Sequence, residues 1–215
     1  MWKPTAFIGL IVLAFPFAAV AASASAFEAL LSRWHAVHGY DFNVDAVEHT
    51  SGETKTASMH VTVDVDKRFE RLVITAGAHR GSIVTWTGGD AETVKLPGLL
   101  SVMSLQEPLR DPKVISLRGN DIRTADLGAI LDCYAGHRDS MIESPGPDVN
   151  GTPTTSVSIS DKNGIVCDGN DPEQGKVVTK DELLISNGTG WPRRRMRFEG
   201  NTLVEQWDIQ DITVR

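Results

Sequence analysis

Apolar and polar residues alternate along much of this chain. The cleanest alternation covers residues 58–65, where every second residue is methionine or valine. A period of two is typical of a strand with one apolar and one solvated face. Further runs of this kind, separated by short polar turns, cover residues 42–50, 69–75, 82–87 and 91–96. The pattern predicts an antiparallel meander that forms a curved sheet.

Strand patterns return in the C-terminal part. Residues 139–151 are rich in proline, glycine and aspartate, and we expect a surface loop there. Strands are then predicted over residues 154–160, 165–168, 176–186, 193–198 and 203–214. In the last of these, Trp207 and Ile209 share one parity, whereas Ile212 and Val214 take the other. This change of parity predicts a β-bulge near Gln210 or Asp211.

Helical patterns occur at three places. Residues 27–38 carry apolar side chains at helical spacing and precede Gly39. Residues 97–105 are apolar almost throughout, which is too short to span a bilayer but suits an element that covers a sheet or closes a cavity. A third helix is predicted from Thr124, as its N-terminal cap, to Gly136. The central helices are therefore expected to cover a sheet formed by the strands on either side.

The first 26 residues have the composition of a secretory signal peptide. Lys3 provides a positive charge, residues 7–20 are apolar, and small residues follow as far as Ala26. The alternative is an uncleaved membrane anchor, because the apolar stretch approaches spanning length. With cleavage, no transmembrane span is expected to remain. The chain of 215 residues with 41% hydrophobic content can build one sizeable core, so residues 27–215 are expected to form a single domain.

The expected mature chain is acidic. Without Lys3 it has 20 basic and 28 acidic residues, a net charge of −8. A negative surface disfavours nucleic acid and anionic membranes as general partners.

Cys133 and Cys167 are the two cysteines of the chain. In an exported protein the oxidising environment predicts a disulfide between them. Such a bridge would close a loop of about 34 residues and stabilise the fold by about 3 kcal/mol. The alternative is a pair of separately buried thiols.

Sequence motifs of the common enzyme classes are missing. The chain has no G-x-S-x-G, P-loop, H-E-x-x-H or dinucleotide-binding motif. His35 and His38 lie three residues apart, but without a third ligand nearby we interpret them as surface residues and not as a metal site. No catalytic residue, metal or cofactor is predicted, and the sequence favours a binding protein over an enzyme.

A cluster of arginines marks the predicted next-to-last strand. Arg193, Arg195 and Arg197 alternate and therefore share one face of that strand. One interpretation is an anion site, or a docking site for an acidic partner. The interpretation that we prefer is a solvated face whose arginines pair with acids such as Glu205 and Asp208 on the neighbouring strand.

The same C-terminal region carries a resemblance to a known family. A strand is followed by Trp191-Pro192, basic residues, a turn at Gly200 and a final strand over 207–214. In the middle of the chain, residues 96–100 (LPGLL) and Arg118-Gly119 with Ile122 precede a short helix. This order of features resembles the LolA-like family of periplasmic outer-membrane lipoprotein carriers.

The resemblance implies an α+β fold in which a strongly curved antiparallel sheet forms an unclosed half-barrel, with helices covering its concave face. It also implies a periplasmic carrier or binding protein that holds lipid or lipoprotein acyl chains in an apolar cavity. The residues predicted to line this cavity are Met59, Val61, Val63, Trp86, Leu99, Leu100 and Met103. Two alternatives stay open: a core filled by the protein's own side chains, and a cell-envelope interaction module that binds a protein partner without lipid.

Overall fold

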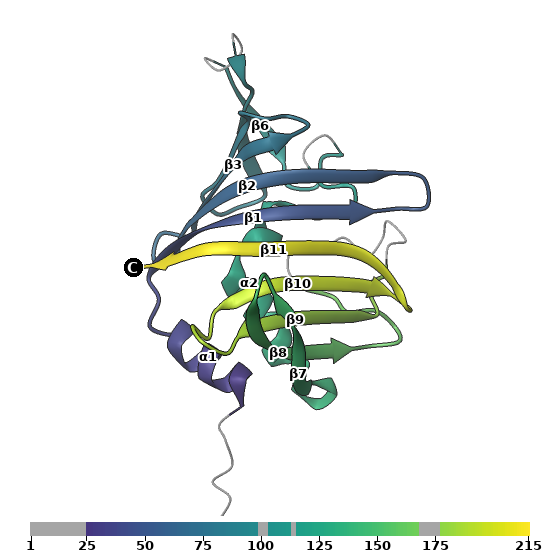
Figure 1. The fold of residues 1–215 in the computed structure, drawn as a ribbon. Coiled ribbons are helices and arrows are strands. Elements are labelled where there is room, and N and C mark those ends of the chain that lie inside the picture. The colour runs from purple at the N-terminus through teal and green to yellow at the C-terminus, as the bar shows by residue number, and fades with distance from the viewer. Residues whose placement is uncertain (1–24, 99–102, 113–114, 168–176) are drawn as a thin grey trace, which may run out of the picture.

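The computed structural model describes residues 25–98, 103–112, 115–167 and 177–215. In this part of the chain, eleven strands form one antiparallel sheet, and two α-helices lie against it (Figure 1). Residues 1–24 of the predicted signal peptide lie outside the described residues.

The sheet consists of two meanders. The first contains β1 (Gly39–His49), β2 (Thr54–Asp64), β3 (Phe69–Gly77), β4 (Ile83–Trp86), β5 (Ala91–Lys95) and β6 (Ser104–Pro108). The second contains β7 (Ile142–Val149), β8 (Thr152–Ser160), β9 (Lys180–Ser186), β10 (Pro192–Glu199) and β11 (Thr202–Val214). The spatial order is β6-β5-β4-β3-β2-β1-β11-β10-β9-β8-β7. The first and last strands therefore pair at the centre of the sheet.

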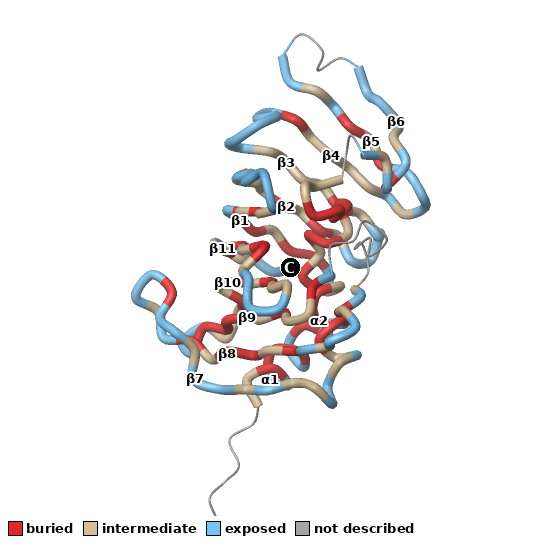
Figure 2. The backbone as a smooth tube through the Cα atoms, turned by 90° about the vertical axis from the view of Figure 1, so that its right-hand side faces the viewer, coloured by how far each residue is buried: buried red, intermediate tan, exposed pale blue. Residues whose placement is uncertain are grey.

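Four helical elements are assigned within the described residues. They are α1 (Ala26–Trp34), η2 (Ile122–Ala125), α2 (Leu127–Gly136) and η3 (Arg138–Ser140). Both α-helices lie on the same side of the sheet, beside its β7–β11 half (Figure 2). β6 and β7 are the two edges of the sheet, which therefore does not close into a barrel. The predicted architecture, an open half-barrel with helices over its concave face, is confirmed.

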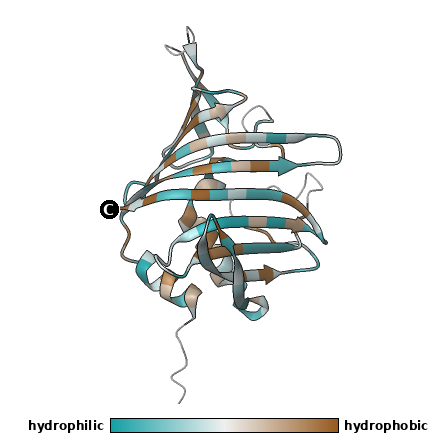
Figure 3. Ribbon diagram, viewed as in Figure 1, coloured by the Kyte–Doolittle hydropathy of each residue, from teal (hydrophilic) through white to brown (hydrophobic). Residues whose placement is uncertain are grey.

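The core lies between the helices and the sheet. Phe27 of α1 packs on Tyr134 of α2 with ring centroids 6.1 Å apart, and Trp34 packs on Tyr40 of β1 at 4.8 Å. The strands β1, β2, β8, β9 and β11 add apolar residues that are nearly inaccessible, namely Phe42, Val44, Val61, Val63, Val157, Ile159, Leu183, Ile185, Trp207 and Ile209. Alternation of hydrophobic and hydrophilic residues along these strands is visible in Figure 3. Side chains of the protein itself thus fill the space beneath α1 and α2.

Both α-helices begin at a side-chain cap. Ser25 accepts a hydrogen bond from the backbone N–H of Glu28, and Glu143 of β7 accepts bonds from the N–H groups of Ala26 and Phe27 at 3.0 and 3.1 Å. Asp126 caps α2 by accepting from the N–H of Gly128 at 2.6 Å. The start of α1 is thereby fixed to an edge strand of the sheet.

Three helix predictions need correction. Thr124 is not the cap of α2, because it lies within η2, where its hydroxyl donates to the carbonyl of Asp121. The first helix ends at Trp34 and not at residue 38. Residues 104–108, which overlap the predicted helix 97–105, form β6, because they pair with β5. The short apolar run was compatible with either structure, and pairing decided it.

One loop prediction and one strand prediction were also wrong. The predicted loop 139–151 contains the strand β7. Prolines at 145 and 147 are tolerated there because β7 is an edge strand that pairs on one side only. Residues 165–167 form no strand.

The predicted bulge is confirmed. Asp41 pairs with Thr213 and Asn43 with Gln210, so β11 has an extra residue at this point. Asp211 in the bulge has φ of 54°. The change of parity in the sequence therefore reports a real change of register.

Candidate functional site on the concave face

A row of apolar side chains crosses the concave face from the core to one edge of the sheet. Val61 pairs with Leu72, Leu72 with Val84, Val84 with Val94, and Val94 with Leu105. We call these five residues the apolar row. Because directly paired residues share one face of a sheet, the row is continuous from β2 to β6.

Exposure differs along the apolar row and is greatest at its β6 end. Val61 is 1% exposed, Leu72 and Val84 are half-buried, Val94 is 9% exposed and Leu105 is 37% exposed. The helices α1 and α2 lie away from β5 and β6, whereas η2 contacts β3 and β4 (Figure 2). The apolar row thus extends beyond the α-helical cover and reaches solvent at β6.

Three of the predicted cavity residues lie at the buried end of this face. Val61 and Val63 belong to the core, and Met59 packs against it. The burial of Val63, 2% exposed, results from packing by the protein's own side chains. Their role in ligand binding stays a prediction.

Two of the other predicted cavity residues, Trp86 and Met103, lie nearer the β6 end. Trp86 of β4 is half-buried and donates from Nε1 to the carbonyl of Gly89 at 3.0 Å. Met103 precedes β6 and is 54% exposed. Leu99 and Leu100 lie outside the described residues. Leu72, Val84 and Val94 were missed as site residues. Alternation in the sequence identifies their strands but does not reveal the strand pairing that aligns these side chains.

A buried acid lies beside the apolar row. Glu92 of β5 is 2% exposed, and neither of its carboxylate oxygens has a hydrogen-bond partner in the described part of the chain. Burial, and after it the negative charge of Asp121, raises the pKa of Glu92 to about 7. Asp121 itself is bound by Arg123, with Nη2 2.6 Å from Oδ2. Glu92 therefore changes charge near neutral pH.

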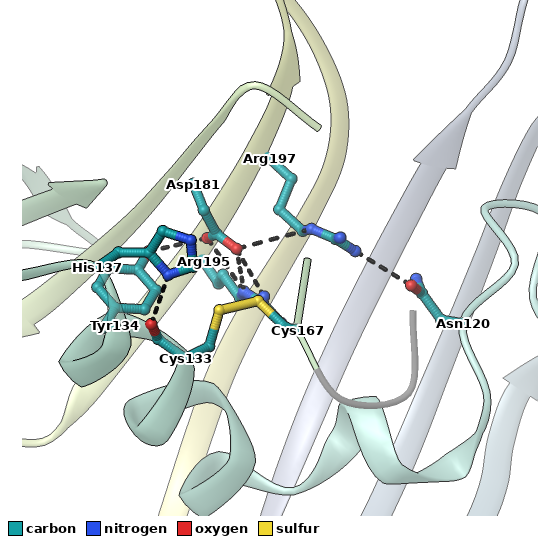
Figure 4. Close-up of a disulfide and its surroundings, with 8 residues drawn as sticks. All are labelled: Asn120, Cys133, Tyr134, His137, Cys167, Asp181, Arg195 and Arg197. Carbon is teal, nitrogen blue, oxygen red and sulfur yellow. Dashed lines mark hydrogen bonds and ion pairs between the residues drawn. A yellow bond between two sulfur atoms is a disulfide. The ribbon is translucent and has the colours of Figure 1, made fainter. Parts of the chain in front are cut away.

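The arginine strand belongs to a buried ionic network (Figure 4). Asp181 of β9 is fully buried and accepts hydrogen bonds from Arg195, with Nη2 2.6 Å from Oδ2, and from the hydroxyl of Tyr134 at 2.8 Å. Arg197 lies 3.6 Å from the same carboxylate. Burial and the charge of Asp181 raise the pKa of Tyr134 well above its usual value, so the hydroxyl stays a donor. This part of the face is polar but already paired internally.

A second part of the network ties the segment before η2 to the sheet. Asn120 donates from Nδ2 to Glu48 at 3.1 Å and to Glu205 at 3.0 Å, and it accepts from Arg197 at 3.1 Å. Glu48 and Glu205 are paired residues of β1 and β11. Burial, and then the charge of Glu205, raises the pKa of Glu48. One amide therefore bridges two carboxyl groups that would otherwise repel each other.

The prediction for the arginines was partly correct. Arg197 pairs with Glu205 at 2.8 Å, as expected, whereas Asp208 pairs with Arg194, which lies on the opposite face of β10. The expectation of a solvated face is wrong, because Arg195 and Arg197 are each 3% exposed. Asp181 was missed because the sequence does not reveal which strand lies on the other side of β10. Arg193 is half-buried.

The predicted disulfide is confirmed. Cys133 of α2 is bonded to Cys167, with Cα atoms 5.4 Å apart. A pocket of about 300 Å³ lies beside the bridge and is lined by Ala129, Asp132, Cys133, Gly136, His137, Val166 and Cys167. The Nδ1 atom of His137 is 2.9 Å from the carbonyl of Cys133. The bridge thus anchors α2 to the segment that follows β8.

The described residues offer neither a metal site nor a membrane-spanning helix. No group of three or more histidine, cysteine, aspartate or glutamate side chains among them could hold a metal ion. None of the helices in this part of the chain has the length and apolarity needed to cross a bilayer.

Comparison with known proteins shows similarity of fold. An uncharacterized conserved protein from Thermus thermophilus is 8% identical with a TM-score of 0.50, over 89% of this chain and 88% of that one. The lipoprotein LppX of Mycobacterium tuberculosis is 12% identical with a TM-score of 0.47, over 86% and 91% of the two chains. A LolA superfamily protein from Nitrosomonas europaea is 12% identical with a TM-score of 0.38, over 89% and 94%.

At 8% identity, the similarity to the Thermus thermophilus protein shows a likeness of fold alone. No protein-family model matches the chain, and no curated protein matches its sequence.

Proposed function

We propose that this protein is an exported binding or carrier protein for an apolar or amphipathic ligand, which lies on the concave face of the sheet. The observation that carries the proposal is the apolar row, which continues past the α-helices and becomes exposed at Leu105. Exposed apolar surface next to a half-covered sheet is typical of a binding site. Met103, exposed beside this end of the row, can adapt its shape to different apolar ligands.

The size of the apolar row suits an extended hydrocarbon chain. Five residues on five adjacent strands span about 19 Å, at about 4.8 Å between neighbouring strands. Burial of each methylene group of the ligand would contribute about 0.8 kcal/mol. A long acyl chain that covers only part of the row would therefore bind measurably.

A ligand that extends along the apolar row toward Val61 requires movement of η2. This element contacts β3 and β4, next to Leu72 and Val84. The segment before it is held by the hydrogen bonds of Asn120 to Glu48 and Glu205. We propose that a ligand enters from the β6 side and that η2 is displaced only when these contacts break.

The test compares two substitutions on adjacent residues of β6. Leu105→Asp places a charge in the apolar row, whereas Gln106→Asp places one on the opposite face, where Gln106 bonds to Thr93. We expect L105D to weaken the binding of a fluorescent long-chain fatty acid about tenfold, equivalent to about 1.4 kcal/mol. Q106D should bind as the wild type does.

Native mass spectrometry of the purified protein provides an independent measurement. The proposal predicts that co-purified lipid is retained by Q106D and depleted in L105D. The proposal would be refuted if both variants and the wild type bound the fatty acid equally and all three were purified without lipid.

A further inference from the structure

The unpartnered carboxyl of Glu92 requires an explanation. Its residue is 2% exposed, and both carboxylate oxygens lack a hydrogen-bond donor among the described residues. Buried polar groups almost always have a partner, and a buried carboxylate without one is costly. A bound ligand that donates hydrogen bonds would remove this cost.

Glu92 occupies a defined place relative to the apolar row. Residues two apart in a strand point to the same face, so Glu92 lies beside Val94 on the concave side. It pairs with Glu107 of β6, the strand that carries exposed Leu105. The carboxyl group thus lies at the end of the row where a ligand would enter.

The charges around Glu92 favour a cation. Asp121 faces it from the segment that leads into η2, and Glu107 faces it from β6. Glu70 is buried on the same face of β3, and Arg123 is bonded to Asp121. When Glu92 is ionised, acids outnumber bases in this neighbourhood.

We propose that Glu92 binds the ammonium head of an amphiphile whose hydrocarbon chain lies along the apolar row. This inference rests on the proposed function and specifies its ligand class. An ammonium group has three donors and no acceptor, which matches two carboxylate oxygens without donors. The contact would be a charge-assisted hydrogen bond in a site largely excluded from water.

The experiment compares decylamine with decanol, which has the same chain length but no charge. Binding is measured by isothermal titration calorimetry at pH 8 and pH 6. An alkylamine resembles the lysine side chain and stays protonated at both values, so any change reports on the protein. With a carboxyl pKa of about 7, the ionised fraction of Glu92 falls about tenfold between pH 8 and pH 6.

We expect the wild type to bind decylamine about tenfold more tightly than decanol at pH 8. At pH 6 its decylamine affinity should fall about fivefold, because the protein with a neutral Glu92 still binds the hydrocarbon chain. Glu92→Gln should bind both compounds equally and without pH dependence. Glu92→Asp keeps the charge and should retain part of the preference. Glu53→Gln removes a charge from the exposed turn between β1 and β2 and should behave as the wild type.

Each contrary result has a separate meaning. Decylamine preference that persists in E92Q, or equal affinity of the wild type for both compounds, overturns the headgroup assignment and leaves the proposed function standing. Failure of the wild type to bind either compound overturns both. Thermal unfolding shows whether E92Q is folded. If E92Q is unfolded, E92D provides the test: a folded E92D that does not prefer decylamine to decanol at pH 8 also overturns the assignment.

Discussion

The Asp181–Arg195 pair offers a strict test of how the interior of this protein is stabilised. Asp181 is fully buried and Arg195 is 3% exposed, and their closest atoms are 2.6 Å apart. Removing one member of such a pair leaves the other charge without compensation in a medium of low polarity. We therefore expect Asp181→Asn to lower the free energy of unfolding by about 3–5 kcal/mol.

The double variant isolates the interaction itself. Asp181→Asn combined with Arg195→Met removes both charges, so it should cost at least about 2 kcal/mol less than the sum of the two single variants. The assay is equilibrium unfolding in urea, followed by tryptophan fluorescence and circular dichroism with the disulfide intact. The wild type and all three variants are measured at the same pH.

A matched control lies on the same strand. Arg194 binds Asp208, but these side chains are 24% and 25% exposed. Because solvent screens this pair, Arg194→Met and Asp208→Asn should show a coupling energy below about 1 kcal/mol. A coupling for the buried pair that is no larger than that of the exposed pair would refute the reasoning.

Two further predictions concern the disulfide and Glu92. Replacing Cys133 and Cys167 together by alanine should lower the free energy of unfolding by about 3 kcal/mol, measured in urea, because the bridge closes a loop with a sequence separation of 34; an unchanged midpoint would contradict this. The pKa of Glu92 is raised by folding from 4.5 to about 7, so the folded state holds this proton more tightly and the wild type loses stability as pH rises through that range. The melting temperature of E92Q minus that of the wild type should therefore increase from pH 5 to pH 8. A difference that does not vary with pH would count against a buried titrating carboxyl.

Much of the architecture could be predicted from alternation. Strands such as β2 have one buried face, so apolar residues recur at every second position of their sequence. The bulge at Asp211 was predicted for the same reason: Ile209 and Ile212 differ in parity in the sequence, yet Ile209 is buried and Ile212 packs against the same core. β6 and β7 were missed because edge strands are less constrained: a proline in β7 breaks no ladder on its unpaired side.

The site could be predicted only in part. Val61 and Val63 were recognised because their own strand shows which face is apolar. Leu105 becomes a neighbour of Val94, and Glu107 a neighbour of Glu92, only through strand pairing, and the periodicity of a single sequence contains no register. Asp181 illustrates the same limit, because it meets Arg195 only when β9 is placed beside β10.

The pairing of β1 with β11 has a consequence for how the protein is made. Tyr40 pairs with Val214 across these strands, so the central ladder joins residues from opposite ends of the domain. Such long-range closure is a slow step in folding. During synthesis, one side of β1 stays unpaired until β11 has been made, and an unpaired strand is prone to aggregation. A chaperone that shields the N-terminal meander during synthesis would protect a protein with this topology.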